Sequence, residues 1–115
     1  MTMNLDMLAF EIHRINKEKG FYEGELTIDK IMAKLALVHS EVTETLEAIR
    51  KDKGDTAIVE EMADTIIRVL DIWAVLFLNH QGDELDSLFP SLETILLAKI
   101  EKNKNRPHLH GHRWG

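Results

Sequence analysis

The chain has 115 residues, a formal net charge of −6 and no cysteine. This length fits one small domain, the acidic charge disfavours a nucleic-acid duplex as a partner, and the lack of cysteine excludes a disulfide framework. A hydrophobic content of 44% supplies a core, but one small bundle would bury that content incompletely. We therefore expect a homodimer or a homotetramer.

The first expected helix covers residues 3–19, where apolar side chains recur at helical spacing. They are Leu5, Leu8, Ile12 and Ile15. Gly20 follows where a glycine commonly ends a helix, and residues 20–26 should form a loop. That loop carries Phe21 and Tyr22, which are candidates for stacking on a nucleobase, although packing within the protein is the commoner role.

The second expected helix spans residues 27–51, with Thr27 or Asp29 as its N-cap. Its apolar stripe consists of Leu35, Val38, Val42, Leu46 and Ile49. The third spans residues 55–79, with Asp55 as its cap. It is apolar nearly all round after Ile66, which indicates a central, buried helix.

The apolar part of the third helix is interrupted by charged residues and is too short to span a bilayer. We therefore expect a cytoplasmic protein with no membrane partner. A fourth helix should run to about Lys104 with Pro90 in its first turn, after a polar connection over residues 81–87. Residues 1–107 would form a single all-α domain, and residues 108–115 an irregular tail.

Two pairs of acids stand at helical spacing on the second and third helices: Glu41 with Glu44, and Glu61 with Asp64. Each pair projects from one face of its helix, because three residues amount to about 300° of rotation. Two antiparallel helices would aim all four carboxylates into one cleft. Hard oxygen ligands of this kind suit Mg²⁺, with Mn²⁺ as the expected substitute.

The alternative interpretation of these acids is an ordinary solvated helix face. Surface acids usually have a lysine or arginine three or four residues away, and Glu41, Glu44 and Glu61 have none at those offsets. Packing unpaired acids together lowers stability unless a cation neutralises them. The pattern therefore favours a metal site.

Neighbouring charges suggest supporting roles. Arg68 should pair with Asp64 or Asp71 and orient the ligands. Asp71 lies about 10 Å along the helix axis from Asp64, so we do not expect both to bind the same ion. Glu47, one turn beyond Glu44, is a further catalytic candidate that would orient a water molecule.

Cationic and amide side chains recur at helical spacing at the end of the fourth helix: Lys99, Asn103 and Arg106. Spacing alone leaves two interpretations, contact with substrate phosphates or a solubilising helix end. Lys34, two turns before Glu41 on the same face, is another phosphate-binding candidate.

The order Glu-x-x-Glu, sixteen residues, then Glu-x-x-Asp resembles the MazG-like, all-α nucleoside triphosphate pyrophosphohydrolases, in their small single-domain branch. Longer segments share the resemblance, which covers residues 34–111. They read SEVTETLEAIR, EEMADTIIRVLDIW and KIEKNKNRPHLHG.

This resemblance implies a bundle of four to five helices, completed by oligomerisation, with active sites near the subunit contact. It implies Mg²⁺-dependent hydrolysis of a nucleoside triphosphate to the monophosphate and pyrophosphate, in the house-cleaning of nucleotide pools. The implied metal ligands are Glu41, Glu44, Glu61 and Asp64. It also favours phosphate contact for Lys99, Asn103 and Arg106, and an approach of His110 to the substrate.

Alternatives remain open at this stage. Phosphoribosyl-ATP pyrophosphohydrolases share the family fold, and a non-catalytic regulatory or assembly module would keep the fold without turnover. No residue set selects a particular base. The alternating histidines near the C-terminus, among them His108 and His112, favour an irregular tail over a transition-metal tract.

Overall fold

The structure, a computed structural model, describes residues 3–80 and 89–107. These residues form helices and no strand, which confirms the predicted all-α class for this part of the chain. The helices are α1 (Leu5–Glu18), α2 (Ile28–Arg50), α3 (Asp55–His80) and α4 (Leu92–Lys104). The polar connection and the irregular tail predicted from the sequence lie outside the described residues.

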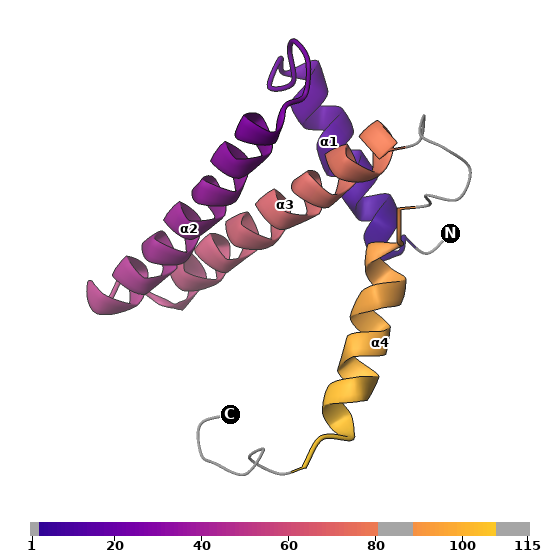
Figure 1. The fold of residues 1–115 in the computed structure, drawn as a ribbon. Coiled ribbons are helices and arrows are strands. Elements are labelled where there is room, and N and C mark those ends of the chain that lie inside the picture. Colours follow the sequence, from indigo (N-terminus) through magenta and orange to yellow (C-terminus); the bar gives the residue numbers. More distant parts are fainter. Residues whose placement is uncertain (1–2, 81–88, 108–115) are drawn as a thin grey trace.

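Helix α3 is the centre of the arrangement, as predicted. It packs against α2 along one side, and α1 crosses its C-terminal half (Figure 1). Helix α4 contacts α1 and extends away from the α2–α3 pair (Figure 1). Among the described residues, no helix combines the length and hydropathy needed to cross a membrane.

The ends of α1 and α2 follow the sequence closely. Gly20 has a φ of 85°, a left-handed conformation that glycine adopts without strain and that stops α1. Thr27 caps α2 by accepting a hydrogen bond from the backbone N–H of Lys30 at 3.2 Å. Of the two predicted caps, Thr27 is therefore the correct one.

Two other predicted helix starts are wrong. Asp55 is the first residue of α3 rather than its cap, and the preceding Gly54, with a φ of 100°, supplies the carbonyl that accepts from Ile58. Pro90 lies before α4, because Ser91 takes the cap position and its hydroxyl accepts from the N–H of Thr94. A serine side chain can satisfy that N–H whereas proline cannot.

The core lies where α1 crosses α3. Its buried members are Ala9, Leu70, Trp73 and Ala74. Two small residues permit the close approach of the helices, and Phe10 and Phe77 pack their rings on Trp73 at centroid distances of 5.2 and 5.0 Å. Trp73 is a core residue, as its position in an apolar segment suggests.

The prediction that α3 is buried from Ile66 onward is wrong for the residues before Leu70. Burial begins at Leu70 and runs to Val75, whereas Ile66 is 55% exposed in this chain. The reason is geometric: α1 covers only the C-terminal half of α3, and α2 covers one side of the rest (Figure 1).

Helix α4 is joined to the core by reciprocal capping. The carboxylate of Asp6 accepts from the Ser91 hydroxyl at 2.5 Å and from the backbone N–H of Glu93 at 2.9 Å. In return, the Glu93 carboxylate accepts from the N–H of Leu5 at 2.8 Å. Each helix start thus satisfies free N–H groups of the other, while Trp73 donates to the Pro90 carbonyl at 3.0 Å.

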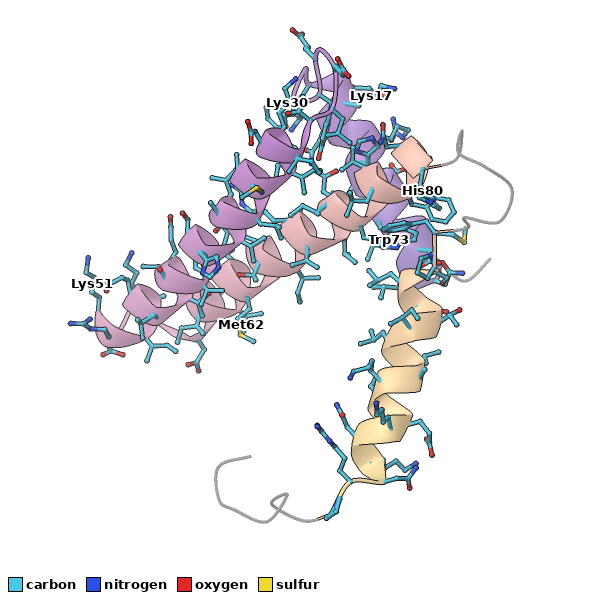
Figure 2. All side chains as sticks on the ribbon, viewed as in Figure 1. Lys17, Lys30, Lys51, Met62, Trp73 and His80 are labelled. Atoms are coloured by element: carbon cyan, nitrogen blue, oxygen red, sulfur yellow. The ribbon has the colours of Figure 1, made fainter. Side chains whose placement is uncertain are left out.

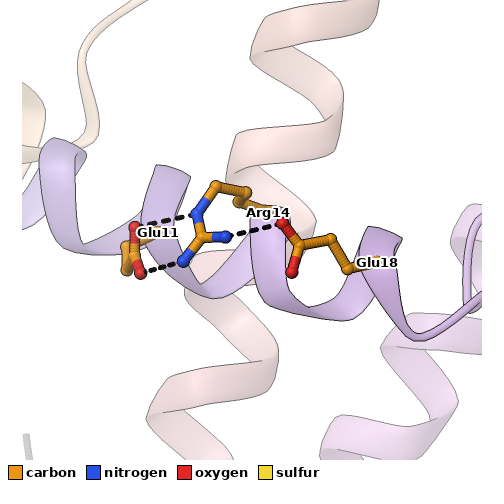
Figure 3. A network of polar contacts seen from close by, with 3 residues as sticks. All are labelled: Glu11, Arg14 and Glu18. Carbon is orange, nitrogen blue, oxygen red and sulfur yellow. Dashed lines mark hydrogen bonds and ion pairs between the residues drawn. The ribbon is translucent and has the colours of Figure 1, made fainter.

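The outer face of α1 carries an ion-pair network (Figure 3). Arg14 donates to Glu11 one turn before it and to Glu18 one turn after it, at 2.5 and 2.6 Å. The hydrogen bond from Arg14 lowers the pKa of Glu11. All three side chains are well exposed, so the network marks a solvated surface and adds little stability.

Candidate metal and phosphate site

Three of the four predicted metal ligands come together between α2 and α3. Glu41, Glu61 and Asp64 each offer a carboxylate oxygen, and these oxygens lie within 4.8 Å of one another. Glu44, the fourth predicted ligand, does not join them within that distance. The i, i+3 spacing on α3 and the antiparallel pairing with α2 bring the three together.

The environment of Glu61 is strongly acidic. Burial raises the pKa of this carboxyl group, and the charges of Glu44, Asp64 and Glu41 raise it further, against a smaller opposing effect of Lys53. Glu44 is therefore near enough to act electrostatically. These surroundings disfavour the charged form of Glu61, and a cation would relieve that repulsion.

Arg68 contacts the cluster, but not through the partner predicted for it. Its Nε donates to Oε2 of Glu41 on the facing helix at 2.7 Å. Pairing with Asp64 or Asp71 was expected, and that prediction is wrong. An arginine on α3 reaches across to α2 because the two helices are adjacent, whereas sequence spacing considers only partners on its own helix.

Carboxylate oxygens are hard ligands of the kind that Mg²⁺ prefers. Two oxygens on adjacent octahedral positions, each about 2.1 Å from the ion, are about 3.0 Å apart. The oxygens of Glu41, Glu61 and Asp64 lie within 4.8 Å of one another, so these side chains could hold Mg²⁺ or Mn²⁺ once they rotate toward a common point.

A cleft of about 550 Å³ is lined by two of the three acids, Glu41 and Asp64, but not by Glu61. Its lining includes Asn16, Phe21, Lys34, Leu37, Glu41, Asp64, Ile67, Arg68 and Asp71. A second cavity of about 530 Å³, between the loop after α1 and the ends of α2 and α3, adjoins this one. The two cavities share Phe21, Lys34 and Leu37 as lining residues, so these side chains lie between them.

Lys34, which the sequence predicts as a phosphate-binding candidate, lines the cleft. Its Nζ is 4.0 Å from the centroid of the Tyr22 ring, in the geometry of a cation–π contact. Phe21 also borders the cleft and is 62% exposed, so its ring remains accessible.

The other predicted phosphate contacts lie elsewhere in this chain. Lys99 and Asn103 are exposed on α4 and Arg106 just beyond it, and none of them lines either cavity. Arg106 donates to the Asn103 amide oxygen at 3.3 Å. Within one chain, the structure does not bring these residues to the acids, because α4 leaves the α2–α3 pair (Figure 1).

The remaining candidates have less to do with the cleft. Glu47 lies 3.6 Å from Arg50 and 3.8 Å from Lys51 on its own helix and is not part of the oxygen cluster. His110 lies outside the described residues.

One group at the cleft was missed as a site by sequence reasoning. Asp71 is buried, and its carboxylate is surrounded by hydrogen-bond donors from His13, Asn16 and Tyr22. The available signal was an acid within an otherwise apolar helix, together with two polar residues three apart on the first helix. Sequence could not show that these segments meet.

Comparison with known proteins gives no match: no family model, no curated protein and no solved structure matches this chain.

Proposed function

We propose that this protein is a Mg²⁺-dependent nucleoside triphosphate pyrophosphohydrolase of the MazG-like type. It would convert a nucleoside triphosphate and water to the monophosphate and pyrophosphate. The observation that carries the proposal is the convergence of Glu41, Glu61 and Asp64, the first and last of which line a cleft together with Lys34. Acids for a cation and a lysine for phosphate in one recess suit a metal-bound polyphosphate.

The residues divide into holding and orienting roles. Glu41, Glu61 and Asp64 would hold the ion, which when bound supplies neutralisation of phosphate charge and a more acidic bound water. Arg68 fixes the orientation of Glu41 through its 2.7 Å contact. A nearby carboxylate that does not hold the ion, such as Glu44, whose charge acts on Glu61, would accept the proton of the attacking water.

Self-association completes the proposal. The accessible surface of the chain is 8888 Å², against about 6,400 Å² for a compact monomer of this mass. Its Cα radius of gyration is 17.0 Å, against about 13 Å for a compact domain of this length. A homodimer or homotetramer would cover the excess surface and allow α4 of one chain to carry Lys99, Asn103 and Arg106 to another chain's cleft.

The test is pyrophosphate release from a panel of canonical and modified nucleoside triphosphates, with Mg²⁺ and with EDTA. We expect metal-dependent release, and a decrease of about a hundredfold or more in Glu41→Gln and Glu61→Gln. Each substitution removes a charged ligand and keeps the side-chain size.

Glu60→Gln is the matched control, because Glu60 is an exposed acid next to Glu61 that is not part of the oxygen cluster. Its activity should match the wild type. Pyrophosphate release that persists in Glu41→Gln, or that is unaffected by EDTA, would contradict the proposed role of the metal ion. If folded protein that binds Mg²⁺ released pyrophosphate from no triphosphate, the proposal would be rejected. A phosphoribosyl-ATP pyrophosphohydrolase or a non-catalytic module would then be the remaining alternatives.

A further inference from the structure

Asp71 is an acid in an unusual position, buried in the half of α3 that forms the core. Its side chain is 11% exposed, yet the carboxylate is well satisfied. His13 Nδ1 lies 3.0 Å from one oxygen, and Asn16 Nδ2 donates to the other at 3.0 Å. Tyr22 donates its hydroxyl to that second oxygen in a short hydrogen bond. Three donors from two segments therefore converge on one carboxylate of a third.

This arrangement fixes the position of the Tyr22 ring. The phenol is anchored at its hydroxyl by Asp71, and its ring makes a T-shaped contact with the His13 ring at a centroid distance of 4.6 Å. Burial, and then the hydrogen bond to Asp71, raise the pKa of Tyr22. The phenol thus remains a neutral donor, and the anchor persists over the working pH range.

The anchored ring in turn touches Lys34. The Lys34 ammonium lies over Tyr22 at 4.0 Å from the centroid, and the same lysine lines the cleft with Glu41 and Asp64. A free lysine side chain samples many rotamers. Contact with a fixed aromatic face restricts that freedom before any phosphate arrives.

We propose that Asp71 and Tyr22 are positioning residues that hold the Lys34 ammonium at the carboxylate cleft, ready for the phosphates of a metal-bound polyphosphate. This inference rests on the proposed function, because it assigns a task to Lys34 within that site. Neither Asp71 nor Tyr22 needs to touch the substrate. Both act through Lys34.

A purely structural role for the same cluster makes a different prediction. Asp71 and Tyr22 could serve only to attach the loop after α1 to α3. In that case their substitution lowers stability, and it changes phosphate affinity by the same factor whether or not Lys34 is present. If they act through Lys34, their loss weakens binding only while Lys34 is present. A double-mutant cycle separates the two.

The experiment measures binding of inorganic tripolyphosphate in the presence of Mg²⁺ by calorimetry, so that no knowledge of the base is needed. We expect Lys34→Met to weaken binding about tenfold, which corresponds to one lost charged contact. Tyr22→Leu should weaken it nearly as much, and the double variant no further. Tyr22→Phe and Asp71→Asn, which keep the ring and the shape of the acid respectively, should lie between Tyr22→Leu and the wild type.

Two controls accompany the cycle. Lys17→Met removes a lysine that borders the second cavity but not the carboxylate cleft, and it should bind tripolyphosphate like the wild type. Affinity for Mg²⁺ alone should be unchanged in every variant. If Tyr22→Leu fails to fold, the same cycle is run with Tyr22→Phe, whose effect should vanish in the Lys34→Met background.

The positioning role would be overturned if the affinity losses of Lys34→Met and Tyr22→Leu multiplied in the double variant, or if Tyr22→Leu bound tripolyphosphate like the wild type. Either result would leave the proposed function intact. A wild-type protein that binds Mg²⁺ but no tripolyphosphate would reject the proposed function, and this inference with it. The two failures are therefore distinguishable in one data set.

Discussion

At the scale of single residues, Glu61 and Asp71 show how surroundings decide the behaviour of a carboxylate. Glu61 faces three other acids, which together with burial raise its pKa. Asp71, ten residues further along α3, is more deeply buried but receives donors from His13, Asn16 and Tyr22. The first environment disfavours the charged form of its acid, whereas the second satisfies its acid with hydrogen bonds from within the protein.

The raised pKa of Glu61 has a consequence for stability. The folded chain holds the proton of this group more tightly than the unfolded chain, so the free energy of unfolding falls as pH rises from the ordinary carboxyl value through the raised pKa. At pH 7 the carboxylate of Glu61 is charged and therefore lowers the free energy of unfolding. We therefore expect Glu61→Gln to melt above the wild type in metal-free buffer, as followed by circular dichroism.

Addition of Mg²⁺ should reverse that order. At a hundred times its Kd, Mg²⁺ should raise the wild-type Tm by about 10 °C, and the shift should be much smaller in Glu61→Gln. Glu60→Gln should melt like the wild type in both buffers. A metal-free Glu61→Gln variant that melts below the wild type would show that the cluster is not under repulsive strain.

At the scale of elements, the attachment of α4 depends on side chains that cap another helix. Asp6 belongs to the first turn of α1 but accepts from Ser91 and Glu93 at the start of α4. In the other direction, the Glu93 carboxylate accepts a hydrogen bond from the backbone N–H of Leu5. Two helix starts that are more than eighty residues apart in the chain thereby stabilise one another.

Asp6→Ala should lower the free energy of unfolding by about 1–2 kcal/mol, because it removes a helix cap and leaves two partly buried donors without a partner. Urea denaturation measures the change. Asp29→Ala is the matched control, since Asp29 occupies the first turn of α2 and is exposed. Equal effects of the two substitutions would mean that only the local helix dipole matters.

At the scale of the whole molecule, apolar surface is the dominant feature. Side chains project on all sides of the α2–α3 pair, Met62 among them (Figure 2). An apolar groove runs between the two helices, with Val42, Thr45, Leu46, Ile49, Met62, Thr65 and Ile66 as its lining. Exposed patches of this kind mark interaction sites, and we expect a second copy of the chain to cover this one.

Met62→Glu should therefore shift the protein toward the monomer in sedimentation equilibrium. Met62 is 50% exposed within one chain, so the substitution should leave the fold of the monomer intact while it places a charge in the groove. Ile28→Glu is the control, because Ile28 is even more exposed, at 74%, and does not line the groove. An unchanged mass for Met62→Glu would exclude this groove as the contact.

Local patterns in the sequence determined a large part of this description. Helical spacing of apolar residues predicted four helices close to their observed bounds, and Gly20 and Thr27 predicted an end and a start, because these features depend only on neighbours within one or two turns. The i, i+3 acids similarly indicated which carboxylates would share a face. The position of Lys34 two turns before Glu41 predicted that the two share a helix face, and both line the cleft.

Contacts between distant segments were decided only by the tertiary structure. The partner of Arg68, the donors around Asp71 and the reciprocal caps of α1 and α4 each join residues 27 or more apart in the chain. Periodicity reports which residues share one helix face, but not which face of another helix lies opposite. For the same reason, spacing gave no sign that α4 would carry Lys99 away from the acids of its own chain.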